Sequence, residues 1–429
     1  MKEFLKKSVV SILTSEAKVV LAKYKPKIIV VTGSVGKTST KDAIFTLLNT
    51  SLSIRKSEKS LRSELGVPLA ILGVENARSD IILWLKNIIH GVSLILFRQK
   101  YPDWLILEIR ASRPGNIRNI MAWLKPDIAV VTPLGDIPVH IEFFKTPEAL
   151  LREKGYLVSS LKEGGLAVLN VDDKNFEYFK SISRQHVITY GFMDNVAEIC
   201  GAHSSILYED KDGRKIPTGI TFKVDYQGNS FPVSLFGILG VQHIYPALAA
   251  LAVGVSQNIN IVKMTEALSS HVPPPGRMKI LSGMKETIII DDTFNASPVA
   301  TKEALLTLRE LDTKGKKIAI LGDMMELGKF STEEHEKIGA LAGEACDILV
   351  TVGLRARGIA EGALDEEMDE SKIFQFEDSI EAGKFIQNKL SAGDVVLVKG
   401  SQIMEMENTV KEIMAYPEDA KKLLVRQGK

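Results

Sequence analysis

The chain has 429 residues, of which 45% are hydrophobic and 25% charged, and its formal net charge is +1. A chain of this size and composition can bury a large core, and we expect a soluble protein of two or three domains. The near-neutral balance gives no general electrostatic reason to expect nucleic acid or an anionic membrane as partner. Cys200 and Cys346 form no metal-ligand spacing and suit a reducing, cytoplasmic compartment.

Residues 1–24 have the periodicity of one amphipathic helix that leads directly into the first predicted strand. Its early lysines precede an apolar run that polar residues cut short of the core of an export signal. Residues 81–97 are more apolar, but polar residues interrupt them, and a spanning helix needs ~20 mostly apolar residues. For this second segment we favour a helix packed on the protein over peripheral attachment to a membrane.

The stretch between residues 27 and 41 contains the parts of a nucleotide site. A buried strand at residues 27–31 is followed by a loop, and a helical pattern resumes at Lys41. Two glycines let the backbone turn N–H groups toward phosphate oxygens, Lys37 supplies charge, and the Thr38 hydroxyl can ligate Mg²⁺. Val31 stands where the common G-x-x-x-x-G-K-[ST] loop has its first glycine, so this is a short form. We expect ATP on these loop residues: Gly33, Ser34, Gly36, Lys37, Thr38 and Ser39.

The distribution of apolar runs predicts an α/β fold. From residue 27 to about 170, β-branched runs alternate with helical patterns, which indicates βαβ units and a mostly parallel sheet. Residues 183–239 read as an antiparallel addition of short strands. The proline-rich stretch 272–276 is stiff enough for a linker, and beyond it the alternation resumes as a second α/β sheet. We place the boundaries at an N-terminal helix (1–24), a central P-loop ATPase domain (25–272) and a C-terminal domain (273–429).

Three ionisable residues of the central domain could complete the nucleotide site. Glu108 ends a predicted strand, at the edge where open parallel sheets place ligands, and it could hold Mg²⁺ or form a surface salt bridge. His140 lies in the loop after the next predicted strand, and the pattern leaves its role as a ligand open. Lys154 lies on a predicted helix, where the sequence alone indicates a solvated side chain.

Five motifs, taken together, are similar to those of the Mur ligase family, and they occur in the family's order: residues 32–40, 108–115, 291–298, 321–328 and 398–401. The resemblance implies a central ATPase domain and a Rossmann-like C-terminal domain that close on each other with ATP between them. It also implies an ATP-dependent amide-bond ligase. In that chemistry a carboxylate attacks the γ-phosphate, and an amine then displaces phosphate from the acyl phosphate. The motifs most resemble the members that join a muropeptide to D-Ala-D-Ala in peptidoglycan synthesis.

The resemblance also implies roles for residues of the central domain. Lys37 and Thr38 match the phosphate and first-magnesium groups, and Glu108 matches the metal-binding glutamate. His140 matches the histidine of a second magnesium site. Lys154 falls where the family carries a lysine modified by CO₂ to a carbamate, an anion able to support that second ion, which reverses the reading of Lys154 as solvated.

Further matches lie in the C-terminal domain. Arg277 matches an arginine expected to reach the phosphates after closure. The end of the first strand of this domain, where the family contacts ATP, carries Asp291, Asp292 and Asn295. Lys399 and Ser401 are candidates for the amine substrate's side, with a helix N-terminal cap as the alternative.

The chain departs from the family pattern at several positions, including Arg110, Pro133, Phe294 and Gln402, and two departures bear on ligand recognition. The Gly-x-His-Asn-x-x-Asn element that helps seat adenine has lost both asparagines, and Gln242, His243 and Pro246 stand in it, so adenine recognition is in question. We keep His243 as a candidate nucleotide contact. Only the helix of residues 1–24 precedes the loop, where these ligases carry a domain that binds the UDP-sugar, so UDP recognition does not carry over.

The sequence therefore predicts a cytoplasmic, monomeric ligase that uses ATP and two Mg²⁺ ions, with a muropeptide and D-Ala-D-Ala as substrates. Nucleic acid is not expected as a partner. Two alternatives stay open: the same chemistry on a non-UDP or lipid-linked acceptor, and a nucleotide-binding regulatory protein that has lost ligation.

Overall fold

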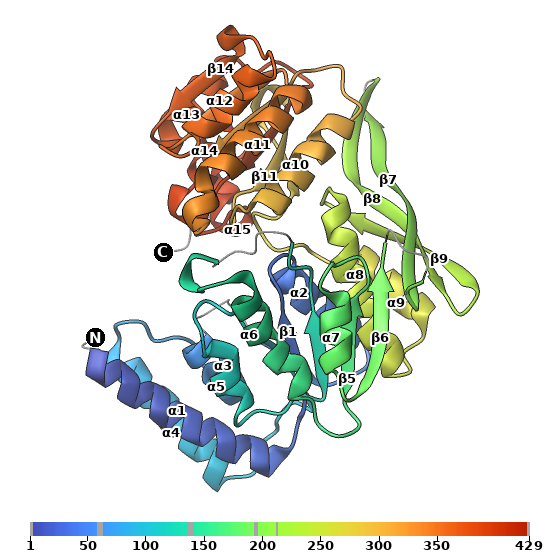
Figure 1. Cartoon of the computed structure of the whole chain (residues 1–429), viewed down its shortest axis with the longest axis vertical. Coiled ribbons are helices and arrows are strands. Elements are labelled where there is room, and N and C mark those ends of the chain that lie inside the picture. The colour runs from blue at the N-terminus through green and yellow to red at the C-terminus, as the bar shows by residue number, and fades with distance from the viewer. Residues whose placement is uncertain (1–2, 58–62, 136–140, 193–195, 212, 427–429) are drawn as a thin grey trace.

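The computed structural model describes residues 3–57, 63–135, 141–192, 196–211 and 213–426 of the chain. It contains a nine-stranded and a six-stranded sheet, each with helices packed on it, and the two units lie one above the other in Figure 1. The mixed α/β fold predicted from the alternating pattern is confirmed. The predicted domain boundaries stay a prediction, although the one near residue 272 falls between the last strand of the first sheet and the first strand of the second.

The larger sheet has the order β2-β3-β1-β4-β5-β6-β7-β8-β9. Its first six strands pair in parallel, whereas β8 pairs antiparallel to both β7 and β9. The antiparallel addition predicted for residues 183–239 is confirmed for β7 to β9. It is wrong for β6, which pairs in parallel with β5 and β7, and the strands β7 and β8, of 13 residues each, are not short. The strands are β1 (Lys27–Thr32), β2 (Ile54–Lys56), β3 (Trp104–Glu108), β4 (Ile128–Val131), β5 (Leu166–Asn170), β6 (His186–Gly191), β7 (Ile199–Lys211), β8 (Arg214–Tyr226) and β9 (Asn229–Phe236).

Both faces of this sheet are covered, because β1 is apolar on both sides. Ile29 and Val31 pack in the cluster that contains α2 and α8, and Ile28 and Val30 pack in the cluster that contains α1, α3 and α5. The helices are α1 (Glu3–Tyr24), α2 (Lys37–Leu48), α3 (Ser63–Leu72), α4 (Ile81–Leu96), α5 (Asn116–Met121), α6 (Pro147–Ser159), α7 (Phe176–Ile182), α8 (Ile244–Ser256) and α9 (Ile261–Ser269). The two helices predicted at 1–24 and 81–97 are confirmed as α1 and α4.

The smaller sheet has the order β10-β11-β15-β12-β13-β14. It is parallel except for the edge strand β10, and helices surround it as in a Rossmann-like unit. Its strands are β10 (Lys279–Ser282), β11 (Ile288–Asp292), β12 (Lys317–Gly322), β13 (Ile348–Val352), β14 (Ile373–Phe376) and β15 (Val395–Lys399). Its helices are α10 (Pro298–Glu310), α11 (Ser331–Ala345), α12 (Arg357–Asp365), α13 (Ser379–Gln387), α14 (Glu407–Ile413) and α15 (Ala420–Leu423).

The β7–β8 hairpin reaches up beside the smaller unit (Figure 1). At its tip Arg214 pairs with Glu286 and Lys215 pairs with Asp312, each at 2.5 Å. These side chains are exposed, and ion pairs of that kind typically contribute ~0.2–1 kcal/mol each. These two ion pairs therefore contribute only weakly to the contact between the units, and their contribution falls as the salt concentration rises.

Candidate active site

The loop between β1 and α2 requires its two glycines. Gly33 has φ +144°, and a Cβ built there would lie 2.1 Å from Thr132 Oγ1 and 2.5 Å from the Thr132 carbonyl oxygen. Gly36 has φ +78°, in the left-handed region, and directly precedes the first residue of α2. A side chain at position 33 has no room, so the close approach of this loop to β4 depends on glycine.

Two of the loop's N–H groups are used within the protein. Ser34 and Val35 both donate to the Pro133 carbonyl oxygen at 3.0 Å. The N–H groups at the start of α2, from Lys37 and Thr38 onward, are those that helix geometry leaves without an intrahelical acceptor. Together with the helix dipole they form the anion-binding part of this loop.

Lys37 curls back over the same loop. Its Nζ donates to the carbonyl oxygens of Gly33 at 3.0 Å and Ser34 at 2.8 Å. Burial, reinforced by the nearby cations Arg110 and Arg277, lowers the pKa of Lys37 to about 7. A bound polyphosphate would bring negative charge beside this amine and favour its protonated form.

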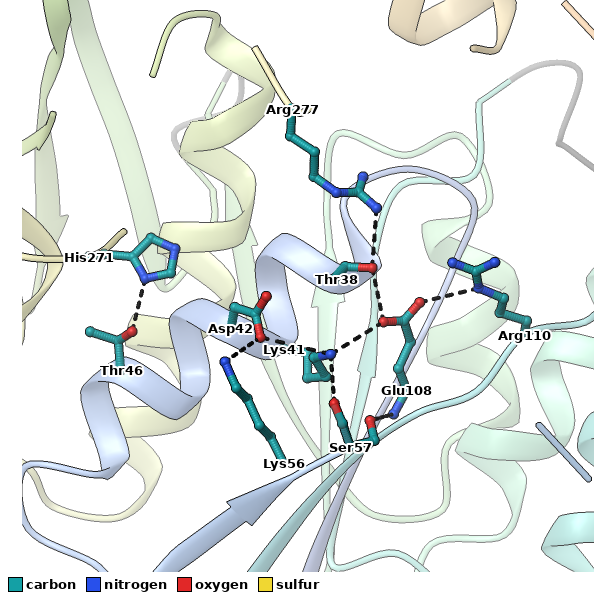
Figure 2. Close-up of polar contacts among 10 residues, drawn as sticks. All are labelled: Thr38, Lys41, Asp42, Thr46, Lys56, Ser57, Glu108, Arg110, His271 and Arg277. Atoms are coloured by element: carbon teal, nitrogen blue, oxygen red, sulfur yellow. Dashed lines mark hydrogen bonds and ion pairs between the residues drawn. The ribbon is translucent and has the colours of Figure 1, made fainter. Parts of the chain in front are cut away.

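A hydroxyl and a carboxylate meet at the ends of α2 and β3. Thr38 Oγ1 donates to Glu108 Oε2 at 2.9 Å, as Figure 2 shows, and Arg110 Nε lies 3.3 Å from the other carboxylate oxygen. Burial alone would raise the pKa of Glu108, but Arg110 and Lys41 hold it below its ordinary value, so the carboxylate is ionised. Mg²⁺ takes hard oxygen ligands and is often bound through one or two carboxylates plus phosphates, and these two residues fit that donor set. Among the described residues no group of three or more His, Cys, Asp or Glu side chains could hold a metal.

Behind Glu108 lies a buried cation that the sequence reasoning missed. Lys41, only 1% exposed, places its Nζ 3.8 Å from Glu108 Oε2 and donates to the Ser57 carbonyl oxygen at 2.8 Å. Ser57 Oγ in turn accepts the N–H of Glu108 at 3.2 Å. The signal was present, because Lys41 lies one helical turn after Lys37 and so on the same face of α2.

Lys154 lies beside the nucleotide loop. It is 2% exposed on α6, and its Nζ donates to Ser34 Oγ at 2.8 Å. The reading of Lys154 as a solvated side chain is therefore wrong. Burial and the neighbouring Lys37 lower its pKa well below the ordinary value, which favours the neutral amine. His140, the other residue predicted for a second magnesium site, lies outside the described residues.

Arg277 extends from the second unit toward the loop. Its Nη2 donates to Thr38 Oγ1 at 3.2 Å, and its guanidinium lies 4.1 Å from the centre of the Phe294 ring (Figure 2 shows the contact with Thr38). Its Nε is buried and, within the part of the chain that the structure describes, has no hydrogen-bond partner. A buried donor of this kind suits an anionic oxygen such as that of a phosphate.

The two acidic residues at the end of β11 hold the segment that carries Arg277. Asp291 accepts N–H groups from Gly276 and Thr293, and burial raises its pKa to about 6. Asp292 accepts the N–H of Met278 and pairs with Lys399 Nζ at 2.6 Å. Both carboxylates therefore form hydrogen bonds to other groups of the protein. The Lys399 amine does so too, because it also donates to the carbonyl oxygen of Asn295.

A cavity of about 660 Å³ lies between the two units, beside the loop. It brings together eight of the predicted site residues: Ser34, Gly36, Lys37, Thr38, Glu108, Arg277, Asn295 and Ser401. It does not bring in Gly33, Ser39, His243, Asp291, Asp292, Lys154 or Lys399. Its wall includes Met325 and Glu326, from the motif at residues 321–328, and three residues outside the motifs: Glu142, Glu405 and Arg426. A larger cavity of about 930 Å³ lies under the tip of the β7–β8 hairpin, away from this loop.

His243 lies behind the loop, at the start of α8. It is buried, and burial followed by the charge of Arg277 lowers its pKa to about 3, so the imidazole is neutral. With Ser39 and Pro246 it lines a hollow of about 20 Å³. A water molecule needs ~10–15 Å³ of cavity volume measured in this way, so the hollow has room for about one water and not for a purine.

Comparisons with known proteins agree with this arrangement. Residues 31–254 match the Mur ligase middle domain, and residues 276–402 match the Mur ligase glutamate ligase domain. The UDP-N-acetylmuramoyl-tripeptide–D-alanyl-D-alanine ligase of Bacillus subtilis is 27% identical over 403 residues, covering 94% of this chain and 79% of that protein.

Solved structures give the same result. MurF of Thermotoga maritima, determined in complex with ADP, has a TM-score of 0.74 and 26% identity, covering 96% of this chain and 84% of that one. MurF of Acinetobacter baumannii has a TM-score of 0.76 at 22% identity, covering 94% and 79%, which supports the fold alone. The match to the middle domain spans more than half of the chain, which therefore belongs to the Mur ligase family.

Proposed function

We propose that this protein is an ATP-dependent ligase that joins a muropeptide carboxylate to the amine of D-Ala-D-Ala in peptidoglycan synthesis. The observation that carries the proposal is the contact between the two units, where Arg277 reaches Thr38 beside Lys37 and Glu108. The relatives named as D-alanyl-D-alanine ligases support the choice of substrates. We also propose that the protein acts as a monomer in the cytoplasm.

The chemistry is governed by charge. A substrate carboxylate and a triphosphate repel each other, and Lys37, Arg110 and Arg277 surround the place where they would meet with positive charge. An oxygen of the carboxylate forms a bond to the γ-phosphorus, and the bond to the β–γ bridging oxygen breaks and releases ADP. The amine nitrogen then attacks the acyl carbon, phosphate leaves with the electron pair of the C–O bond, and the nitrogen loses a proton to give the amide.

Thr38 and Glu108 would hold one Mg²⁺, which when bound neutralises charge between phosphate oxygens. We assign His140 and a carbamylated Lys154 to a second ion, as the family resemblance implies. The support for carbamylation is the buried, neutral amine of Lys154, because only an unprotonated nitrogen can form a bond to CO₂. Carbon-13 NMR of the protein equilibrated with labelled bicarbonate should show a carbamate signal that is absent from Lys154→Arg.

The direct test supplies purified protein with ATP, Mg²⁺, UDP-N-acetylmuramoyl-tripeptide and D-Ala-D-Ala, and follows phosphate release and the mass of the product. We expect pentapeptide and one phosphate per product. Lys37→Ala should lose at least ~10³-fold in rate, since positioning of the phosphates is most of the catalysis.

Two results would change the assignment. Turnover only with a lipid-linked or non-UDP muropeptide would keep the ligase and change its acceptor. ATP binding without phosphate release from any acid and amine pair would contradict ligation and indicate a regulatory role.

A further inference from the structure

Helix α4 (Ile81–Leu96) has two apolar faces, of which the protein covers one. Trp84, Asn87, Gly91 and Leu94 are buried against the protein. The opposite side carries large apolar side chains that are 42–69% exposed, which we call the α4 stripe: Ile81, Ile82, Leu85, Ile89, Val92, Leu96 and, just after the helix, Phe97. From Ile82 to Leu96 their spacing alternates between three and four residues, so they form one continuous line along the helix.

The α4 stripe is held in place by α1. Lys23 Nζ donates to the carbonyl oxygens of Leu94, Ile95 and Phe97 at 2.8–2.9 Å, at the end of α4. This contact brings the C-terminal end of α1 next to the C-terminal end of α4. Earlier in both helices, Gly91 lies so close to the Glu16 carboxylate that a Cβ would not fit. The two helices therefore run parallel as a packed pair, which Figure 1 shows at the end of the molecule away from the C-terminal unit. The exposed stripe is a fixed surface.

The charges on this helix pair and its flanking residues are mostly positive. The described residues 8–25 and 78–100 include seven exposed basic residues: Lys18, Lys23, Lys25, Arg78, Lys86, Arg98 and Lys100. Over the same residues only two acidic side chains occur, the helix cap Asp80 and the buried Glu16. The whole chain has a net charge of only +1, so positive charge is concentrated on α1, α4 and their flanking residues, and we call these seven residues the basic rim of the helix pair. Phe97, the last residue of the stripe, directly precedes Arg98 in the chain.

We propose that the α4 stripe and its basic rim dock on the surface of an anionic lipid bilayer, with α4 lying in the plane of the interface. An apolar helix face flanked by lysine and arginine is the arrangement that binds there. Insertion across the bilayer is excluded for α4, because it has 16 residues and no helix among those described is long and apolar enough to span.

A second copy of the chain fits the same surface less well. A two-fold symmetric contact through α4 would bring the two basic rims together, and like charges would oppose it. An anionic lipid surface instead complements the rim, and each basic residue near such a surface strengthens binding. Docking at this end of the molecule leaves the cavity between the units uncovered, so the proposal does not depend on the ligase reaction.

The test is flotation of the full-length protein with vesicles of phosphatidylcholine alone or mixed with phosphatidylglycerol. We expect flotation with the mixed vesicles at low salt, loss at high salt, and no flotation with phosphatidylcholine. Leu85→Glu should reduce the bound fraction by more than ~10-fold. The double variant Arg98→Gln, Lys100→Gln changes no buried group and should reduce it by ~5-fold for each charge removed.

Leu354→Glu is the matched control, because Leu354 is 70% exposed on the C-terminal unit. It should float like the unmodified protein, and circular dichroism should show that all variants are folded. Absence of flotation, equal flotation with neutral vesicles, or equal loss in Leu354→Glu would overturn the proposal. So would a dimer in solution, measured by light scattering, that Leu85→Glu dissociates.

Discussion

Replacement of Lys41 by methionine tests the importance of the buried cation behind Glu108. Methionine keeps most of the length of the side chain and removes its charge and its hydrogen bond to the Ser57 carbonyl oxygen. Lys56 provides a matched comparison, because it pairs with Asp42 at 2.7 Å, which is closer than the 3.8 Å between Lys41 and Glu108. Distance alone would make Lys56 the more important residue.

Burial reverses that order. Lys41 and Glu108 are each 1% exposed, whereas the side chain of Lys56 is 32% exposed. Removing one partner of a buried pair leaves an uncompensated charge and costs ~3–5 kcal/mol. Glu108 keeps Arg110 and the Thr38 hydroxyl, so we expect about 2–3 kcal/mol of destabilisation for Lys41→Met. For Lys56→Met we expect less than ~1 kcal/mol.

Tryptophan fluorescence during urea unfolding measures the difference in stability between the two variants. It reports on the part of the protein that contains both lysines, because all three tryptophans, Trp84, Trp104 and Trp123, lie there. Lys41→Met should lower the midpoint clearly more than Lys56→Met. Equal midpoints, or a larger effect of Lys56→Met, would refute the reasoning that burial outweighs distance here.

Three further changes have defined outcomes. Arg277→Lys keeps the positive charge but removes the planar guanidinium that reaches Thr38, so kcat/KM for ATP should fall by ~10²-fold. The melting temperature measured by calorimetry should stay near that of the unmodified protein. Gly33→Ala places a Cβ against Thr132, and titration calorimetry should show loss of ADP binding in a folded protein. His243 has a pKa of about 3 in the folded protein against ~6.5 in the unfolded chain, so below pH 6.5 the unfolded chain takes up a proton that the folded protein does not. Its contribution to stability therefore falls as pH drops below 6.5, by up to ~1.4 kcal/mol per pH unit. In His243→Gln the urea midpoint should depend less on pH between 6.5 and 4.5.

Local patterns predicted the elements that carry their own signal. The loop at Gly33 was recognisable because strand, glycines and helix follow one another within a few residues. The long apolar strands and the antiparallel segment were recognisable for the same reason. The short edge strands β2, β10 and β14 were not predicted, since three or four residues at a sheet edge contain too little periodicity.

Contacts between distant residues were the part that local patterns could not supply. Lys154 reads as solvated from its helix alone, but it is buried and donates to Ser34, 120 positions earlier in the chain. Arg426 is another such case. It donates to the carbonyl oxygens of Thr293 and Phe294 and pairs with Glu407, and nothing in its own neighbourhood in the sequence indicates that role.

The charged groups of the second unit connect Lys399, a predicted substrate residue, to the segment that carries Arg277. Lys399 was predicted for the amine side, but its Nζ pairs with Asp292, which also accepts the N–H of Met278, next to Arg277. Loss of Lys399 would leave a buried carboxylate without its cation and loosen the segment that presents Arg277. Lys399 is therefore expected to affect the phosphates through Arg277. Ser401 lines the cavity and its Oγ accepts the N–H of Met325 at 2.8 Å, and its role on the amine substrate's side stays a prediction.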